Sequence, residues 1–155
     1  MGNAQRGENL DPGHPQRPVL VQIFDNNNNQ VGADIFGTVF YDAASGLFKG
    51  PVSTNIASGV YTVKVKSERY LRKLLPGIQT ITSKQTNNLA PGTLIVGDIN
   101  NDNELNIIDY NFFRGCYQQS PISDACIDAD LNDNGVIDAF DYNLFIGNLS
   151  HQQGD

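Results

Sequence analysis

Several residue types are scarce or missing in this chain, and each absence narrows what the protein can do. It has no tryptophan and only two histidines, His14 and His151, which lie near its two ends. No run of about 18 apolar residues is present, so no membrane span is expected. Neither a Ser-His-Asp arrangement nor a glycine-rich phosphate loop can be found. The sequence therefore predicts that the chain is not an enzyme.

Positive charge is also missing from one part of the chain. Residues 97–155 contain a single basic residue, Arg114, against eleven acidic residues, whereas residues 1–96 contain nine basic and six acidic residues. Segments that differ so much in charge are typical of separate structural units. An acidic segment of this kind favours cations as partners and argues against nucleic acid.

Short apolar runs alternate with Gly, Pro and Asn turns before the acidic segment. In GVYTVKVKS (59–67), Tyr61, Val63 and Val65 lie on one side, as in a half-buried strand. Further candidate strands are VLVQIF (19–24), DIFGTVFY (34–41), IQTITS (78–83) and TLIVG (93–97). We therefore expect an antiparallel β-sandwich over 18–96, after an extended arm or linker at 1–17. Its G-x-Y-x-V-x-V pattern resembles transthyretin-like and Cna-B-type bacterial surface modules.

The acidic segment repeats itself after 32 residues. GDINNDNELNIIDYNFFRG (97–115) aligns without gaps on ADLNDNGVIDAFDYNLFIG (129–147), and both copies contain D-Y-N-x-F-x-G. A gap-free repeat of this length indicates a duplicated supersecondary unit.

Each copy has the spacing of a twelve-residue calcium loop, with oxygen-bearing side chains at positions 1, 3, 5, 9 and 12 and a backbone carbonyl expected at position 7. The predicted ligands of two Ca²⁺ ions are Asp98, Asn100, Asp102, Glu104, Asn106 and Asp109 in the first loop, and Asp130, Asn132, Asn134, Val136, Asp138 and Asp141 in the second. The alternative is a pair of polar turns with helix caps. Magnesium fits less well, because it prefers a smaller octahedral shell that retains water.

The two loops differ at position 6, which is Gly135 in the second loop and Asn103 in the first. Asn is among the residues that best tolerate positive φ, so we expect the same turn in both. Position 8 is apolar in both copies (Leu105 and Ile137), which predicts a short β bridge between the loops. A helix is expected to leave each loop, near Ile108 and Phe140, but the segments entering the loops show no helical pattern.

A tandem of loop-helix units over residues 97–150 resembles the dockerin family, whose pattern is G-D-x-N-x-D-G-x-[VI]-[ND]-x-x-D. The resemblance implies an α+β fold in two units, a β-sandwich followed by a small all-α dockerin-like domain, with a tail at 151–155. A β-sandwich beside a dockerin is similar in architecture to the X-module–dockerin pairs of cellulosome scaffolds. The partner-contacting positions implied by the resemblance are apolar here: Ile107, Ile108, Ala139 and Phe140.

Cys116 and Cys126 lie between the two loops. We expect them to form a disulfide between the end of the first helix and the connector, with two buried thiols as the alternative. A basic stretch, KVKSERYLRK (64–73), lies in the β unit. It would suit a solvated strand face, a binding site for nucleic acid or an acidic partner, or a contact with the acidic unit of the same chain.

These features predict a calcium-stabilised extracellular or cell-surface interaction module that binds a cohesin-like partner. The alternative is a structural subunit that assembles with copies of itself into a surface layer, fibre or tube, its arm adding a strand to a neighbour. A third reading is a fragment of a secreted glycoside-active enzyme whose catalytic residues lie outside this chain.

Overall fold

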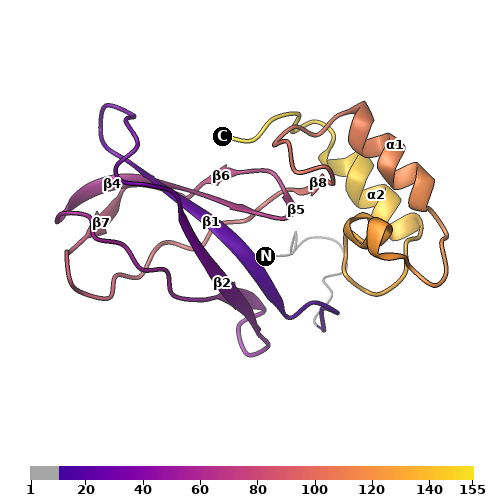
Figure 1. Cartoon of the computed structure of the whole chain (residues 1–155), viewed down its shortest axis with the longest axis horizontal. Helices are drawn as coiled ribbons and strands as arrows, with labels where there is room; N and C mark the ends of the chain where they lie inside the picture. Colours follow the sequence, from indigo (N-terminus) through magenta and orange to yellow (C-terminus); the bar gives the residue numbers. More distant parts are fainter. Residues whose placement is uncertain (1–10) are drawn as a thin grey trace.

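Strands make up the first part of the chain and helices the last part in the computed structural model, which describes residues 11–155 (Figure 1). The strands are β1 (Gln16–Phe24), β2 (Ile35–Asp42), β3 (Leu47–Lys49), β4 (Gly59–Ser67), β5 (Arg69–Tyr70), β6 (Lys73–Leu74), β7 (Gln79–Ile81) and β8 (Val96–Asp98). The helices are α1 (Ile107–Cys116), the 3₁₀ helix η1 (Asp124–Ala129) and α2 (Ala139–Asn148). The predicted fold class, an antiparallel β unit followed by a small helical unit, is confirmed.

The main sheet has the strand order β3-β2-β1-β4-β6, and β7 also pairs with β4. All of these pairings are antiparallel. Alternate residues of β1 are buried on one face of the sheet, among them Val21 and Ile23, which pair with Val65 and Val63 of β4. This face packs against Ile56 and other residues outside the strands, which form much of the opposing layer of the β unit.

The longer predicted strands are found where the sequence placed them. GVYTVKVKS (59–67) coincides with β4, and the predicted strand at 34–41 lies within one residue of β2. The run at 93–97 forms a strand only from Val96 onward. The strands β3, β5 and β6 were not predicted, because two or three residues show no alternating pattern by themselves. The equally short β7 and β8 were found only because they overlap longer apolar runs.

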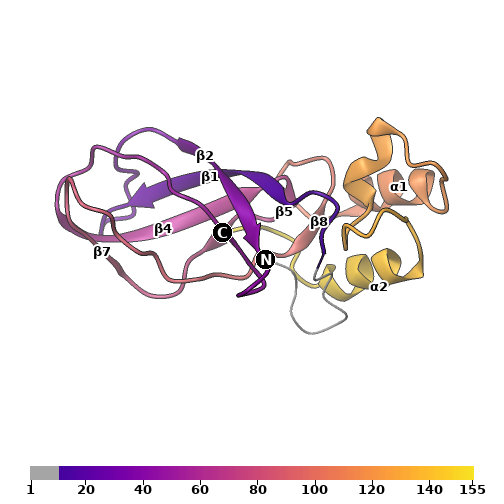
Figure 2. The same ribbon diagram turned by 90° about the horizontal axis from the view of Figure 1, so that it is seen from below.

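The two units meet at a second, two-stranded sheet that joins β5 to β8. Tyr70 and Leu71, which lie within the basic stretch, are buried in the apolar core of the helical unit. Figure 2 shows the main sheet and the two α-helices at opposite ends of the molecule, with β5 and β8 between them. The basic stretch therefore lies against the acidic unit of the same chain, one of the three arrangements expected for it.

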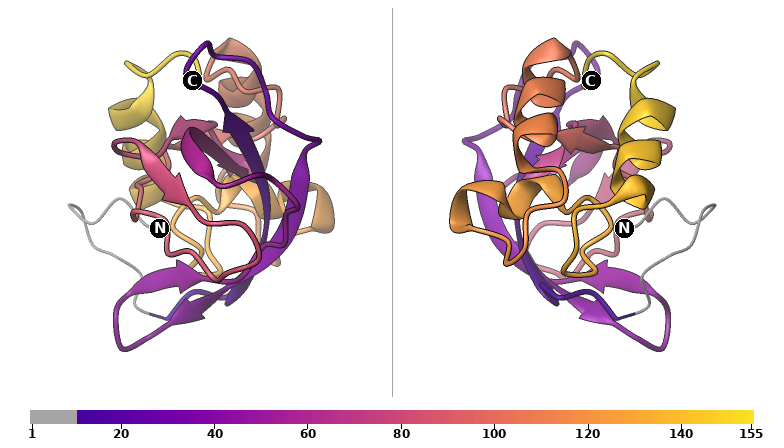
Figure 3. Two further views of the ribbon diagram at one scale, coloured as in Figure 1. Left: turned by 90° about the vertical axis from the view of Figure 1, so that its left-hand side faces the viewer. Right: turned by 90° about the vertical axis from the view of Figure 1, so that its right-hand side faces the viewer.

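The helices α1 and α2 lie side by side and are related by the sequence repeat (Figure 3). Phe113 and Phe145, which occupy equivalent positions in the repeat, stack with ring centroids 6.0 Å apart and are almost fully buried. Cys116 and Cys126 form a disulfide that joins the end of α1 to η1. None of the helices in residues 11–155 is long and apolar enough to span a membrane.

The predicted β bridge between the two loops is wrong. The backbone N–H of Leu105 donates to the carbonyl of Gln152, and the carbonyl of Ile137 accepts from the N–H of Gln118. The backbone groups expected to pair with each other are thus engaged by the C-terminal tail and by the connector after α1. Residues 1–10 of the predicted arm lie outside the described residues.

Candidate functional site

The two loops repeat the same internal hydrogen bonds as well as the same residue types. At loop position 3, the side-chain oxygens of Asn100 and Asn132 accept from the backbone N–H two residues later. The position 5 side chains, Asp102 and Asn134, do the same. These turns orient successive polar side chains within each loop, as a twelve-residue cation loop requires.

Both loops use left-handed backbone at the same places. Position 4 has a φ of 62° at Asn101 and 61° at Asp133, and position 6 has a φ of 70° at Asn103 and 83° at Gly135. The expectation that Asn103 adopts the turn of Gly135 is confirmed. The loops consequently have matching shapes despite the difference in sequence.

The last loop positions begin the helices. Asn106 and Asp138 are the N-caps of α1 and α2, and their backbone N–H groups donate at 2.9 Å to the carboxylates of Asp109 and Asp141, respectively. Asp109 and Asp141 are fully buried. Burial raises the pKa of both carboxyl groups, although backbone N–H groups donate to each of them. Polar turns with helix caps, the alternative reading of the sequence, are therefore present in both copies.

The first loop position holds an unsatisfied group. Among residues 11–155, Oδ2 of Asp98 accepts from the N–H of Asn103 at 3.0 Å, but Oδ1 has no hydrogen-bond partner although Asp98 is fully buried. A buried carboxylate oxygen without a partner is costly, and a bound cation would satisfy it. Capping explains the end of this loop, but it does not explain this oxygen at its beginning.

The donor set fits calcium better than a metal bound by acidic residues alone. Within residues 11–155, no group of three or more His, Cys, Asp or Glu side chains is placed to hold a metal ion by itself. Each predicted loop also offers two Asn or Asp side chains at its middle positions and a backbone carbonyl. Calcium accepts such mixed oxygen shells of about 6–8 ligands, so the residues present fit this ion.

Cationic side chains of the β unit reach both loops. Lys66 donates to Asp98 Oδ2 at 2.5 Å, and Arg69 donates to the backbone carbonyl of Asp130 at 2.5 Å. Arg17, which lies in β1, and His14, which lies just before it, contact the carboxylate of Asp133.

No sequence pattern singles out Asp133, because loop position 4 is not a calcium-ligand position. Asp133 is nevertheless buried, and its backbone carbonyl also accepts from the N–H of Gly13. The excess of basic residues in the first unit was the one sequence signal that pointed to this contact.

The two α-helices also expose apolar side chains. Ile107 and Phe140, which lie at or beside the helix starts, are 66% and 67% exposed. Ile108 and Ala139 are exposed as well. Further exposed apolar residues on the two helices are Phe112, Tyr142 and Ile146. Exposed apolar residues gathered on adjacent elements are typical of an interaction surface.

Comparison with known proteins agrees with this geometry. Residues 96–150 match the dockerin type I domain. The C-terminal unit is a dockerin-like domain.

Two solved structures resemble the chain over both units. They are an N-terminal and a C-terminal interface mutant of a type II cohesin–X-dockerin complex from Acetivibrio cellulolyticus. Each is 20% identical, covers 85% of this chain and 80% of the matched chain, and has a TM-score of 0.54. The β unit and the dockerin-like domain together therefore have the X-module–dockerin fold. A search of curated protein sequences found no match.

Proposed function

We propose that this chain is a calcium-stabilised extracellular interaction module whose dockerin-like domain binds a cohesin-like partner. The observation that carries the calcium part is the buried, unpartnered Oδ1 of Asp98 at the first position of a loop that recurs 32 residues later. The dockerin match supports it, because dockerins are calcium-binding, non-catalytic interaction modules. Calcium and a disulfide between Cys116 and Cys126 both suit an extracellular setting.

The proposed ligands are the six residues of each loop named from the sequence, with Glu104 and Val136 contributing backbone carbonyls. When bound, calcium supplies positive charge and oxygen coordination that offset the burial of the loop carboxylates. The remaining contribution comes from hydrogen bonds within the chain. Asp109 and Asp141 link each loop to the first turn of its helix, so the order of a loop determines where its helix starts.

The proposed partner surface includes Ile107, Ile108, Ala139 and Phe140. The stacked pair Phe113 and Phe145 holds α1 and α2 together beneath it. Both helix starts must therefore be in place before the surface is complete. This connects the loops to partner binding through the packing of the two helices.

A titration against purified cohesin domains of types I and II tests this function. We expect at least one cohesin to bind the full chain in calcium, and binding to be lost in excess chelator. F140E is expected to weaken that complex at least tenfold, because a desolvated anchor residue is worth more than about 1.4 kcal/mol. F36E is the matched control, since Phe36 is 76% exposed on β2, away from the helices.

The same samples test the alternative of self-assembly. Growth of large particles from the pure protein as calcium is added, measured by light scattering, would favour a structural subunit. A particle size that stays that of a monomer, together with cohesin binding, would favour the interaction module. In the present structure His14, just before β1, contacts Asp133 of its own chain and not a neighbouring subunit.

A further inference from the structure

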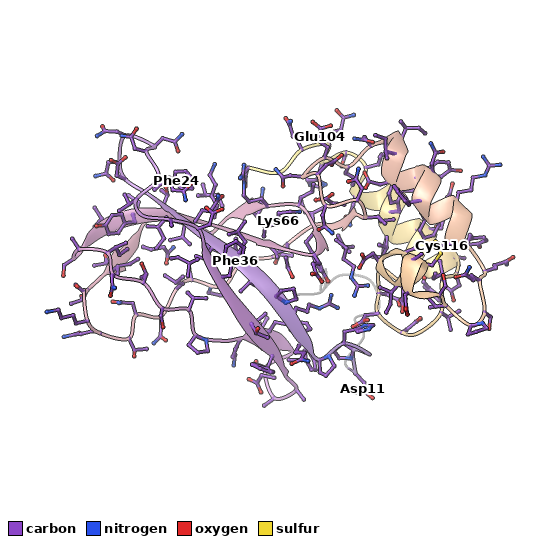
Figure 4. The ribbon with its side chains drawn as sticks, in the orientation of Figure 1. Asp11, Phe24, Phe36, Lys66, Glu104 and Cys116 are labelled. Atoms are coloured by element: carbon purple, nitrogen blue, oxygen red, sulfur yellow. A yellow bond between two sulfur atoms is a disulfide. The ribbon has the colours of Figure 1, made fainter. Side chains whose placement is uncertain are left out.

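One lysine of the β unit is bonded to a proposed calcium ligand. Lys66 Nζ lies 2.5 Å from Oδ2 of Asp98 and 2.9 Å from the backbone carbonyl of Tyr70. The side chain of Lys66 is 17% exposed and that of Asp98 is fully buried, so water screens this ion pair weakly. Figure 4 shows Lys66 between the sheet and the helical unit.

The second loop lacks this arrangement. Oδ1 and Oδ2 of Asp130 accept from the backbone N–H groups of Asn134 and Gly135. Among residues 11–155, no Lys or Arg forms an ion pair with the Asp130 carboxylate. The cations nearest to this loop pair with carboxylates that are not proposed ligands: Arg17 and Arg69 with Asp133, and Arg69 also with Asp128.

The two proposed ligand sets are otherwise equal in charge. Each contains three Asp side chains and two Asn side chains at positions 1, 3, 5, 9 and 12. The Glu104 side chain bonds to Asn106 and Gln153 and is exposed. The main electrostatic difference at a ligand carboxylate is therefore the ammonium group of Lys66.

We propose that Lys66 sets the calcium affinity of the first loop below that of the second, so that the second loop fills first. This inference rests on the proposed calcium binding. A calcium ion at Oδ1 of Asp98 has to share that carboxylate with the ammonium group of Lys66 on Oδ2. The ion and the ammonium group, which are both positive, repel each other across the carboxylate. Lys66 thus neutralises part of the charge of the first loop, which weakens the attraction of that loop for a cation.

Calorimetric titration of calcium into the chelator-stripped full chain tests the proposal. Two sites of different affinity are expected, with D98N removing the weaker site and D130N the tighter one. K66Q is expected to tighten the weaker site by about tenfold, the scale of one screened charge pair, and to leave the tighter site unchanged. K64Q is the matched control, because Lys64 lies on the same strand and stacks over Phe24 instead.

An unchanged or weaker first site in K66Q would overturn the proposal, and so would two equal sites in the unmodified chain. If K66Q does not fold, as judged by its circular dichroism, K66M retains the packed alkyl chain without the charge and has the same expected result. If the proposed calcium binding is itself wrong, the titration gives a different result, because the unmodified chain then binds no calcium at all.

Discussion

Asn103 and Gly135 adopt the same left-handed backbone at equivalent places in the two loops, with φ values of 70° and 83°. Asn103 also accepts a hydrogen bond from the backbone N–H of Arg72 through its side chain at 2.7 Å. The residue that departs from the calcium-loop pattern therefore connects the first loop to the β unit. Within residues 11–155, Gly135 makes no hydrogen bond to the β unit. It contributes to the second loop through its left-handed backbone.

Gly135→Ala is expected to lower the free energy of unfolding by about 1 kcal/mol in saturating calcium. A Cβ at this position meets no atom of residues 11–155 within 4 Å, so the cost is conformational and not steric. Gly115→Ala is the control, since it lies within α1 with equally open surroundings and is expected to stabilise by roughly 0.5–1 kcal/mol. Chemical denaturation measures both, and equal effects of the same sign would contradict the assignment of the turn.

Removal of calcium is expected to unfold the helical unit while the main sheet persists. The loops contain buried carboxylates, whereas the core of the β unit is a separate apolar cluster that includes Val63. Far-ultraviolet circular dichroism should lose its helical component in chelator and regain it with added calcium. A spectrum that does not change in chelator would show that folding is not coupled to the ion.

Arg69→Gln is expected to destabilise the contact between the two units by about 2–3 kcal/mol, because the guanidinium is buried and donates to two backbone carbonyls. Limited proteolysis should then cut more readily between β7 and β8. Arg114→Gln serves as the control, since Arg114 is exposed at the end of α1. If both variants resist protease equally, Arg69 does not hold the units together.

Replacing Cys116 and Cys126 with serine is expected to cost roughly 2–3 kcal/mol, since the bridge closes a loop with a sequence separation of 10. Thermal unfolding in calcium, with and without reductant, measures this. The reductant should lower the midpoint of the unmodified chain and leave that of the double variant unchanged. An equal response of the two proteins would argue against a stabilising disulfide.

The parts of the structure that depend on local pattern were predictable from the sequence. The alternation of Tyr61, Val63 and Val65 located β4, and the repeat located both loops and both helix starts. The cysteine pairing was also expected, on the basis of spacing and compartment. The division at 96/97 and the individual ligand assignments stay predictions.

The contacts between distant segments were not predictable, because they depend on how the two units pack. No pattern indicates that Lys66 bonds to Asp98, or that Arg17 and Arg69 share Asp133. The predicted bridge between Leu105 and Ile137 was wrong for a similar reason. The N–H of Leu105 donates to Gln152, and the carbonyl of Ile137 accepts from Gln118. The opposite net charges of the two units indicated that the units attract each other, but they did not indicate which residues form the contacts.

Native mass spectrometry of the purified full chain, sprayed after exchange into a volatile buffer with calcium, counts the bound ions. We expect a monomer carrying two calcium ions, one ion in D98N and one in D130N, and none after chelation. A chain that carries no calcium, or whose ion count is unaffected by both substitutions, would contradict it.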